Sequence, residues 1–153
     1  MDYKIVEMPA KTMAGISVHT TNENMQAADD IIKLWEEFWD KNIFSFTKHK
    51  KNSMLYGIYT NYEGDYTKPF DFYACCEVES PANNSSEYSV ITVPKSKYAR
   101  FSIRGNYDNT VEKLWDVIWK TRLDRKYTYD LEVYHNDGND PDDQLLEIYI
   151  AIK

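Results

Sequence analysis

Glu132 lies in the middle of a strand-like segment, residues 129–134, between two apolar neighbours. Side chains alternate between the two faces of a strand, so Glu132 shares a face with Asp130 and Tyr134. A carboxylate in this position can neutralise a cation or serve as a general base. A row of polar residues on one face is also typical of a solvated strand surface. Alternation alone favours that solvated surface for Glu132.

Familiar catalytic and metal-binding motifs are missing from the sequence. It contains no G-x-S-x-G, no G-x-x-x-x-G-K-[ST], no G-x-G-x-x-G and no H-E-x-x-H. The three histidines, His19, His49 and His135, are far apart. The acidic stretch 137–143 has its glycine at the second position and a proline inside, which does not fit a calcium loop. We therefore expect no metal and no cofactor, and a polar hairpin connection at 137–143.

Aromatic residues are abundant, with 13 Tyr, 4 Trp and 6 Phe in 153 residues. Tyrosine combines a large apolar body with a polar tip, so a surplus of it indicates a ligand cavity as readily as a core. The pattern Leu-Trp-x-x-x-Trp occurs twice, at 34–39 and at 114–119. This spacing places each tryptophan pair on one helix face, and we expect both pairs to pack against a sheet rather than to stack on a ligand.

The charge balance and the cysteines limit the partners and the compartment. A net charge of −7 repels a phosphate backbone, so we expect no direct binding to nucleic acid. No apolar run is long enough to cross a membrane, and the N-terminal residues do not resemble a signal peptide. Cys75 and Cys76 are adjacent inside an apolar run, which favours reduced and buried thiols over a disulfide. Together these features predict a cytoplasmic protein.

An internal repeat runs through the chain. A shift of the sequence by 75 to 85 positions aligns four pairs of segments in the same order: 3–9 with 88–94, 31–39 with 111–119, 58–59 with 133–134, and 72–76 with 148–152. We infer that residues 1–153 form a single domain built from two halves, about 1–80 and 86–153.

Hydrophobic periodicity predicts the same order of elements in each half. Strands are expected at 3–8, 12–20, 54–61, 70–79, 87–94, 97–105, 128–135 and 145–152, and helices at 25–40 and 109–120. Asn109 as the N-cap with Glu112 three residues later predicts a capping box at the start of the second helix. The predicted fold class is α+β, with tandem duplicated β-α-β-β units, pseudo-twofold symmetry, and two helices on a mostly antiparallel curved sheet. A cleft is expected where the halves meet.

Several segments, in this order, resemble the GyrI-like effector-binding family. They are Val6-Glu7-Met8-Pro9 followed by Ala14-Gly15-Ile16, Tyr56-Gly57-Ile58-Tyr59, Pro94-x-x-x-Tyr98-Ala99-x-Phe101, and residues 129–134 with the C-terminal run 148–153. The resemblance covers nearly the whole chain. It implies the ligand-binding domain that is found attached to AraC- and MerR-type transcription regulators and also as stand-alone proteins.

The resemblance implies a binding function and reverses the interpretation of Glu132. In the family, a Glu of the penultimate strand lies at the base of an aromatic pocket and neutralises bulky lipophilic cations, and by position this is Glu132. Candidate walls are Tyr134, which shares the face of Glu132, then Tyr149 and Tyr59, and more weakly Tyr73. The chain leaves no room for a helix-turn-helix module, so we expect a stand-alone effector-binding or multidrug-binding protein rather than direct transcription control.

Two other functions stay open at this point. The resemblance also extends to members that hydrolyse reactive electrophiles, for which Glu132 would be the catalytic general base that activates water. The namesake of the family inhibits DNA gyrase, so gyrase or a separate regulator is a further candidate partner. The oligomeric state is not predicted by the sequence.

Overall fold

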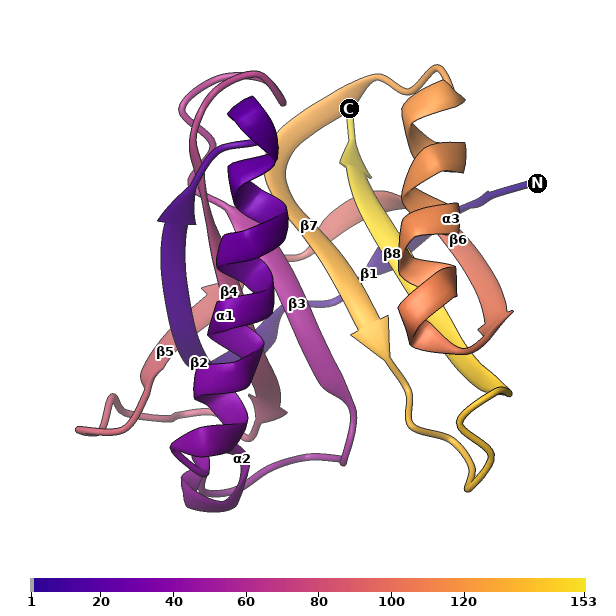
Figure 1. Cartoon of the computed structure of the whole chain (residues 1–153). Helices are drawn as coiled ribbons and strands as arrows, with labels where there is room; N and C mark the ends of the chain where they lie inside the picture. Colours follow the sequence, from indigo (N-terminus) through magenta and orange to yellow (C-terminus); the bar gives the residue numbers. More distant parts are fainter. Residues whose placement is uncertain (1) are drawn as a thin grey trace.

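Eight strands form one sheet in the computed structural model, which describes residues 2–153 (Figure 1). They are β1 (Lys4–Met8), β2 (Lys11–Thr20), β3 (Leu55–Thr60), β4 (Phe70–Val78), β5 (Ser89–Val93), β6 (Ser96–Gly105), β7 (Arg125–Tyr134) and β8 (Gln144–Ile152). The spatial order is β1-β6-β8-β7-β3-β4-β2-β5, and every neighbouring pair is antiparallel. The segment 137–143 joins β7 to β8 as the predicted hairpin connection.

Two long helices, α1 (Gln26–Asp40) and α3 (Tyr107–Lys120), lie on the same face of the sheet and run in opposite directions (Figure 1). The short helices η1 (Glu23–Met25) and α2 (Ile43–Phe46) flank α1. Apolar side chains recur every three or four residues in the long helices, so one side of each faces the sheet. The predicted α+β class, with two main helices on an antiparallel sheet, is confirmed. None of the helices within residues 2–153 is long and apolar enough to cross a membrane.

The start of α3 differs from the prediction. Its N-cap is Asn106, which has extended backbone angles and whose side chain accepts the backbone N–H of Asp108 at 2.9 Å. The predicted capping box with Asn109 as N-cap and Glu112 is wrong, because Asn109 already lies inside the helix. The Asn106 side chain satisfies one free N–H group of the first turn, so the helix begins after Asn106, three residues before the predicted start.

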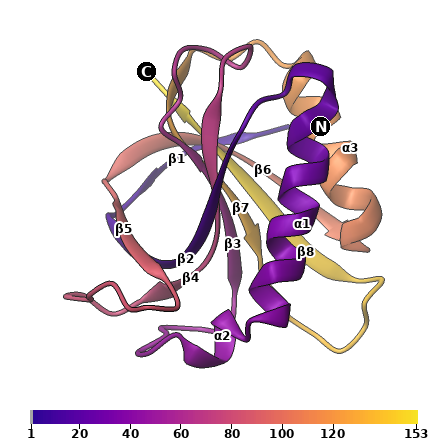
Figure 2. The ribbon, with the colours of Figure 1, turned by 60° about the vertical axis from the view of Figure 1, so that its left-hand side comes forward.

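The sheet is strongly curved, and two short connections show why (Figure 2). Only Pro9 and Ala10 separate β1 from β2, although β1 is at one edge of the sheet and β2 is next to the other edge. Three Cα–Cα steps span at most about 11 Å, so the two ends of the sheet have to approach each other. Pro94 and Lys95 make the same connection between β5 and β6.

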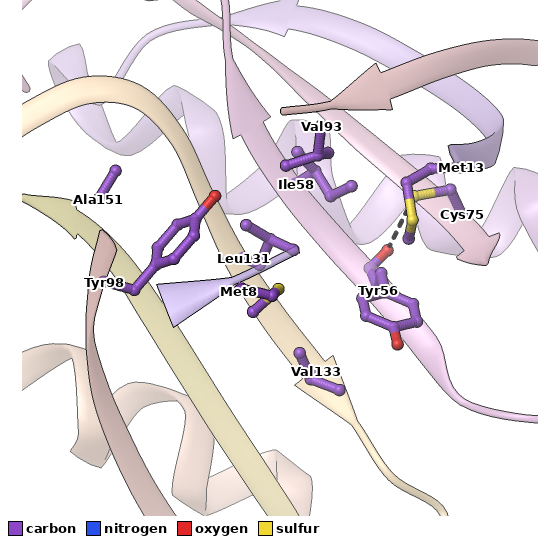
Figure 3. Close-up of a cluster of buried hydrophobic side chains, with 10 residues drawn as sticks. All are labelled: Met8, Met13, Tyr56, Ile58, Cys75, Val93, Tyr98, Leu131, Val133 and Ala151. Atoms are coloured by element: carbon purple, nitrogen blue, oxygen red, sulfur yellow. Dashed lines mark hydrogen bonds between the residues drawn. The ribbon is translucent and has the colours of Figure 1, made fainter. Parts of the chain in front are cut away.

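The core has a layer on each face of the sheet. On the face away from the helices, the concave cluster contains Met8, Met13, Tyr56, Ile58, Cys75, Val93, Tyr98, Leu131, Val133 and Ala151 (Figure 3). On the helix side, one cluster gathers around Phe38 and Phe72 below α1, and another around Leu114 and Ile148 below α3. The central pair β3–β7 therefore lies between buried layers on both faces.

The strand order is the same when read from either edge of the sheet. From one edge it is β1-β6-β8-β7, and from the other it is β5-β2-β4-β3. Each strand of residues 4–78 thus has a counterpart in residues 89–152 at the matching position. The internal duplication itself stays a prediction.

Candidate functional site

Glu132 is buried at the centre of the sheet. Its exposed fraction is 2%, and it lies opposite Gly57 in the pairing of β3 with β7. The solvated strand surface that alternation alone favoured is therefore wrong for Glu132. Its side chain points to the helix side of the sheet, because the Glu132 carboxylate bonds a side chain of α3.

Three neutral groups hold the carboxylate of Glu132. Tyr59 Oη on β3 donates to Oε2 at 2.8 Å, and Trp115 Nε1 on α3 donates to the same oxygen at 2.7 Å. Tyr134 Oη, two residues along β7, donates to Oε1 at 2.7 Å. Within residues 2–153, no Lys, Arg or His nitrogen lies within 4.0 Å of this carboxylate. Glu132 is thus hydrogen-bonded and has no cationic partner among the described residues.

Burial and these hydrogen bonds act on the pKa of Glu132 in opposite directions. Burial disfavours the charged form and raises the pKa above 4.5, whereas the bonds from Trp115, Tyr134 and Tyr59 favour the charged form and lower it. Burial has the larger effect, so the pKa of Glu132 is raised. Burial and the nearby carboxylate also raise the pKa values of Tyr59 and Tyr134 well above 10.0, so both hydroxyls keep their protons and remain donors.

Two cavities lie between α1 and α3. The first cavity, of about 200 Å³, is lined by Asn22, Ala27, Ala28, Ile31, Tyr59, Tyr62, Tyr66, Phe70, Trp115, Trp119 and Arg125. The second cavity, of about 440 Å³, is lined by Trp35, Trp39, Leu55, Tyr107, Asp108, Val111, Tyr134 and Asn136. Tyr59 and Trp115 line the first cavity, and Tyr134 lines the second. Glu132 therefore lies behind aromatic side chains that separate it from both cavities.

All four tryptophans of the repeated motif line these cavities. Trp35 packs edge-on against Phe38 and Phe72, as expected for core packing. Trp39 and Trp119, however, are half-exposed, at 52% and 47%. The expectation of core packing alone is thus wrong for the outer tryptophans. Trp115 is a site residue that the motif spacing did not predict, because the spacing indicates the helix face and not the partner of the indole N–H.

The predicted wall residues divide between the two faces of the sheet. Tyr59 and Tyr134 contact Glu132, as described above. Tyr149 and Tyr73 pack against the concave cluster on the opposite face, and the Tyr149 hydroxyl donates to Glu147 at 3.2 Å. The cause is strand alternation: Tyr149 pairs with Leu131, whose side chain points away from Glu132. We therefore leave Tyr149 and Tyr73 out of the site.

A second buried carboxylate, Asp130, lies beside the first cavity and is fully buried. It accepts hydrogen bonds from Tyr62 Oη at 2.6 Å, from an Arg125 terminal nitrogen at 2.8 Å, and from the backbone N–H of Ala151 at 2.9 Å. Strand alternation predicts that Asp130 shares a face with Glu132, but it indicates no hydrogen-bond or ion-pair partner for Asp130. It missed Arg125 because β7 is irregular before Asp130, where Tyr127 has a φ of 55°.

The comparison with known families identifies this arrangement. The sequence model of Cass2, the integron-associated effector binding protein, matches residues 4–152. The chain belongs to the Cass2 family. Cass2 proteins have a GyrI-like effector-binding domain, so the predicted resemblance is confirmed.

Individual relatives are similar over almost their whole length. The crystal structure of an integron cassette protein from Vibrio cholerae shares 31% identity with this Cass2-family chain, with 99% of the chain and 96% of the relative covered and a TM-score of 0.79. "Putative transcriptional regulator protein YobU" of Bacillus subtilis is 29% identical over 155 residues, and the match covers 97% of this chain and 96% of the relative. The structure of SAV2435 bound to tetraphenylphosphonium has a TM-score of 0.74 at 21% identity, and the match covers 100% of this chain and 94% of SAV2435. This similarity shows a shared fold.

Proposed function

We propose that this Cass2-family protein binds bulky lipophilic aromatic cations between α1 and α3, with Glu132 as the counter-ion. One observation carries the proposal: a fully enclosed carboxylate is held by three neutral donors and has no cationic side chain beside it. A buried ion without a partner is costly, so a cationic ligand would supply the missing charge. The shared fold with SAV2435, which was solved with a lipophilic phosphonium cation, supports this class of ligand.

The aromatic groups around Glu132 suit the same ligand. The Tyr59 and Trp115 rings meet edge to face at 5.3 Å, and Trp35 meets Tyr134 in the same way at 6.0 Å. The face of such a ring attracts a cation by roughly 0.5 to 2 kcal/mol, depending on desolvation. Charge and apolar bulk would then determine binding, with loose demands on ligand shape.

The enclosure of Glu132 and the small first cavity imply that the site opens on binding. Drug-sized ligands occupy pockets of roughly 300 to 1,000 Å³, and the first cavity measures about 200 Å³. A bulky ligand that reaches Glu132 has to move at least one of Tyr59, Trp115 and Tyr134 and exchange its hydrogen bond for the ligand's charge.

A dye titration tests the proposal. We expect Glu132→Gln to weaken the binding of rhodamine 6G, a fluorescent lipophilic cation, by at least about tenfold, because the amide has nearly the same shape and no charge. Glu147→Gln is the matched control, since Glu147 lies on the neighbouring strand β8 and bonds His135 and Tyr149 instead. Equal affinity of the wild type and Glu132→Gln would overturn the counter-ion role.

Hydrolysis of reactive electrophiles is a second candidate. The specific observation is the raised pKa of Glu132 next to tyrosine hydroxyls, which suits a general base that activates water. Time-dependent loss of an activated aryl ester, abolished in Glu132→Gln, would support hydrolysis. Recovery of the intact ester after prolonged incubation would leave binding as the function.

We also propose that the site arose where two duplicated halves meet. The matching strand orders from the two sheet edges support this, with β3 of one half beside β7 of the other. Glu132 and Gly57 then occupy equivalent positions in the two halves. One half supplies the carboxylate and the other supplies the space for it.

A further inference from the structure

Arg125 is a buried cation in the wall of the first cavity. Its side chain is 9% exposed, and within residues 2–153 it makes one side-chain hydrogen bond, to Asp130 at 2.8 Å. Its Nε is buried and has no hydrogen-bond partner in residues 2–153. A buried N–H group without a partner is unfavourable. Nε lacks an acceptor among the described residues, and a ligand that enters an opened site can supply one.

The guanidinium plane of Arg125 is fixed from several sides. It lies 4.5 Å from the centre of the Tyr127 ring and 5.6 Å from that of Trp119. Asp130 holds one of its terminal nitrogens and is itself held by Tyr62 Oη and by a backbone N–H. A guanidinium has five N–H donors in a rigid fork that matches the two oxygens of a carboxylate. Here, one donor is used and the fork is already oriented.

The charges around the cavity also differ from those of a simple cation site. Asp130 balances the charge of Arg125, and Glu132 adds one negative charge that no group in the described part of the chain balances. A plain lipophilic cation would satisfy Glu132, but it would leave the Arg125 donors without an acceptor. It would also meet Trp119, a cavity residue that already carries the Arg125 guanidinium.

We propose that the preferred ligand of this cavity is an aromatic zwitterion, whose cationic part is neutralised by Glu132 and whose carboxylate accepts hydrogen bonds from Arg125. The inference rests on the proposed function and names the ligand class more closely. Tyr59 and Trp115 bond Glu132 and line the same cavity as Arg125. Once one of these two side chains moves aside, Glu132 and Arg125 can both reach one rigid aromatic ligand.

Two dyes with one ring system test this inference. Rhodamine 6G is an ethyl ester and carries only positive charge, whereas its de-esterified free acid is a zwitterion at neutral pH. We expect the wild type to bind the free acid at least about tenfold more tightly than the ester in fluorescence-anisotropy titrations. We expect this preference to disappear in Arg125→Gln combined with Asp130→Asn, a pair that removes both buried charges together and avoids leaving Asp130 without its cation.

Three further variants keep the test decisive. Arg125→Lys retains a positive charge next to Asp130 but loses the fork, so it should reduce the preference even if the double variant does not fold. Arg104→Gln should leave the preference unchanged, because Arg104 binds Asp143 away from this cavity. Glu132→Gln should weaken the binding of both dyes and leave the ratio of their affinities unchanged.

Each failure is distinguishable. Equal binding of the two dyes by the wild type, or an undiminished preference in both Arg125 variants, would overturn the role of Arg125. Unchanged affinity of both dyes in Glu132→Gln would instead overturn the proposed function.

Discussion

Gly57 lies directly opposite Glu132 where β3 pairs with β7. A Cβ atom on Gly57 would come within 2.8 Å of Oε1 of Glu132 and within 2.7 Å of the Phe72 ring. Real Cβ atoms do not approach other atoms so closely, so the carboxylate occupies the space that the missing side chain leaves. Gly57 is required here by this close approach and not by a turn.

Gly57→Ala should therefore disturb both the site and the fold. The added methyl group has to displace Glu132 or Phe72, and overpacking of this kind costs about 1 to 3 kcal/mol of the free energy of unfolding. Urea denaturation should show this loss, and titration with rhodamine 6G should show weaker binding. Gly64→Ala is the control, because a Cβ there would meet only the flexible side chain of Lys68. Unchanged dye affinity in Gly57→Ala would contradict the close contact.

The ligand-free protein should become more stable when Glu132 is replaced by Gln at neutral pH. The pKa of Glu132 is raised above 4.5 in the folded protein. The stabilisation that the protonated carboxyl gives to the folded state is therefore complete below about pH 4.5, and it is lost as the pH rises through the folded-state pKa. At neutral pH the wild type carries the cost of the buried charge, and the amide does not. Thermal melts should show a higher melting temperature for Glu132→Gln than for the wild type near pH 7, and this difference should decrease toward pH 4.5. A less stable variant near pH 7 would count against the raised pKa.

Cation binding should weaken as the pH falls through the raised pKa of Glu132, because the proton and the cation compete for the carboxylate. Tyr134→Phe removes a hydrogen bond that favours the charged form, so it should move the midpoint of this pH dependence upward. The measurement is the rhodamine 6G affinity between about pH 4 and pH 8. Tyr149→Phe removes a hydroxyl from the opposite face and should leave the midpoint in place. Equal shifts in both variants would contradict the assignment of faces.

The two cysteines should react slowly with thiol reagents. Both are free and buried, and burial raises the pKa of Cys76 to about 11 and that of Cys75 well above 9.0. The thiolate is the reactive form, so labelling at neutral pH should follow unfolding of the protein. Labelling rates measured at increasing urea concentration should rise with the unfolded fraction. Rapid labelling of the native protein would contradict the burial of both thiols.

Much of the fold followed from local patterns. Prolines 9 and 94 separate apolar runs of alternating residues, and the strands begin and end within a few residues of the predicted positions. The start of α3 was harder, because Asn106 and Asn109 both carry capping signals and only the three-dimensional structure distinguishes them. The pairing of β1 with β6 could not be predicted from local patterns either, because it joins residues that are far apart in the sequence.

The site was predicted less completely, for a geometric reason. Alternation assigns one strand face to water, whereas β7 is buried on both faces from Asp130 to Val133. Only the family resemblance indicated a pocket at Glu132. Alternation also fails for Arg125, because the irregular backbone near Tyr127 changes which face the strand presents. Trp115 was assigned to core packing, since the spacing of a helix does not reveal what an indole N–H will bond.

The two edge strands, β1 and β5, each pair with a strand that is distant in the sequence, and this has a consequence for synthesis of the protein. Within residues 2–153, β1 pairs only with β6, and β2 receives its outer partner from β5. During translation, β1 and β2 are made well before residues 89–105 supply these partners. Until then, the nascent chain has unpaired strand edges that are open to other chains. A truncated chain that ends at Val78 would therefore be prone to aggregation rather than form a smaller binding protein.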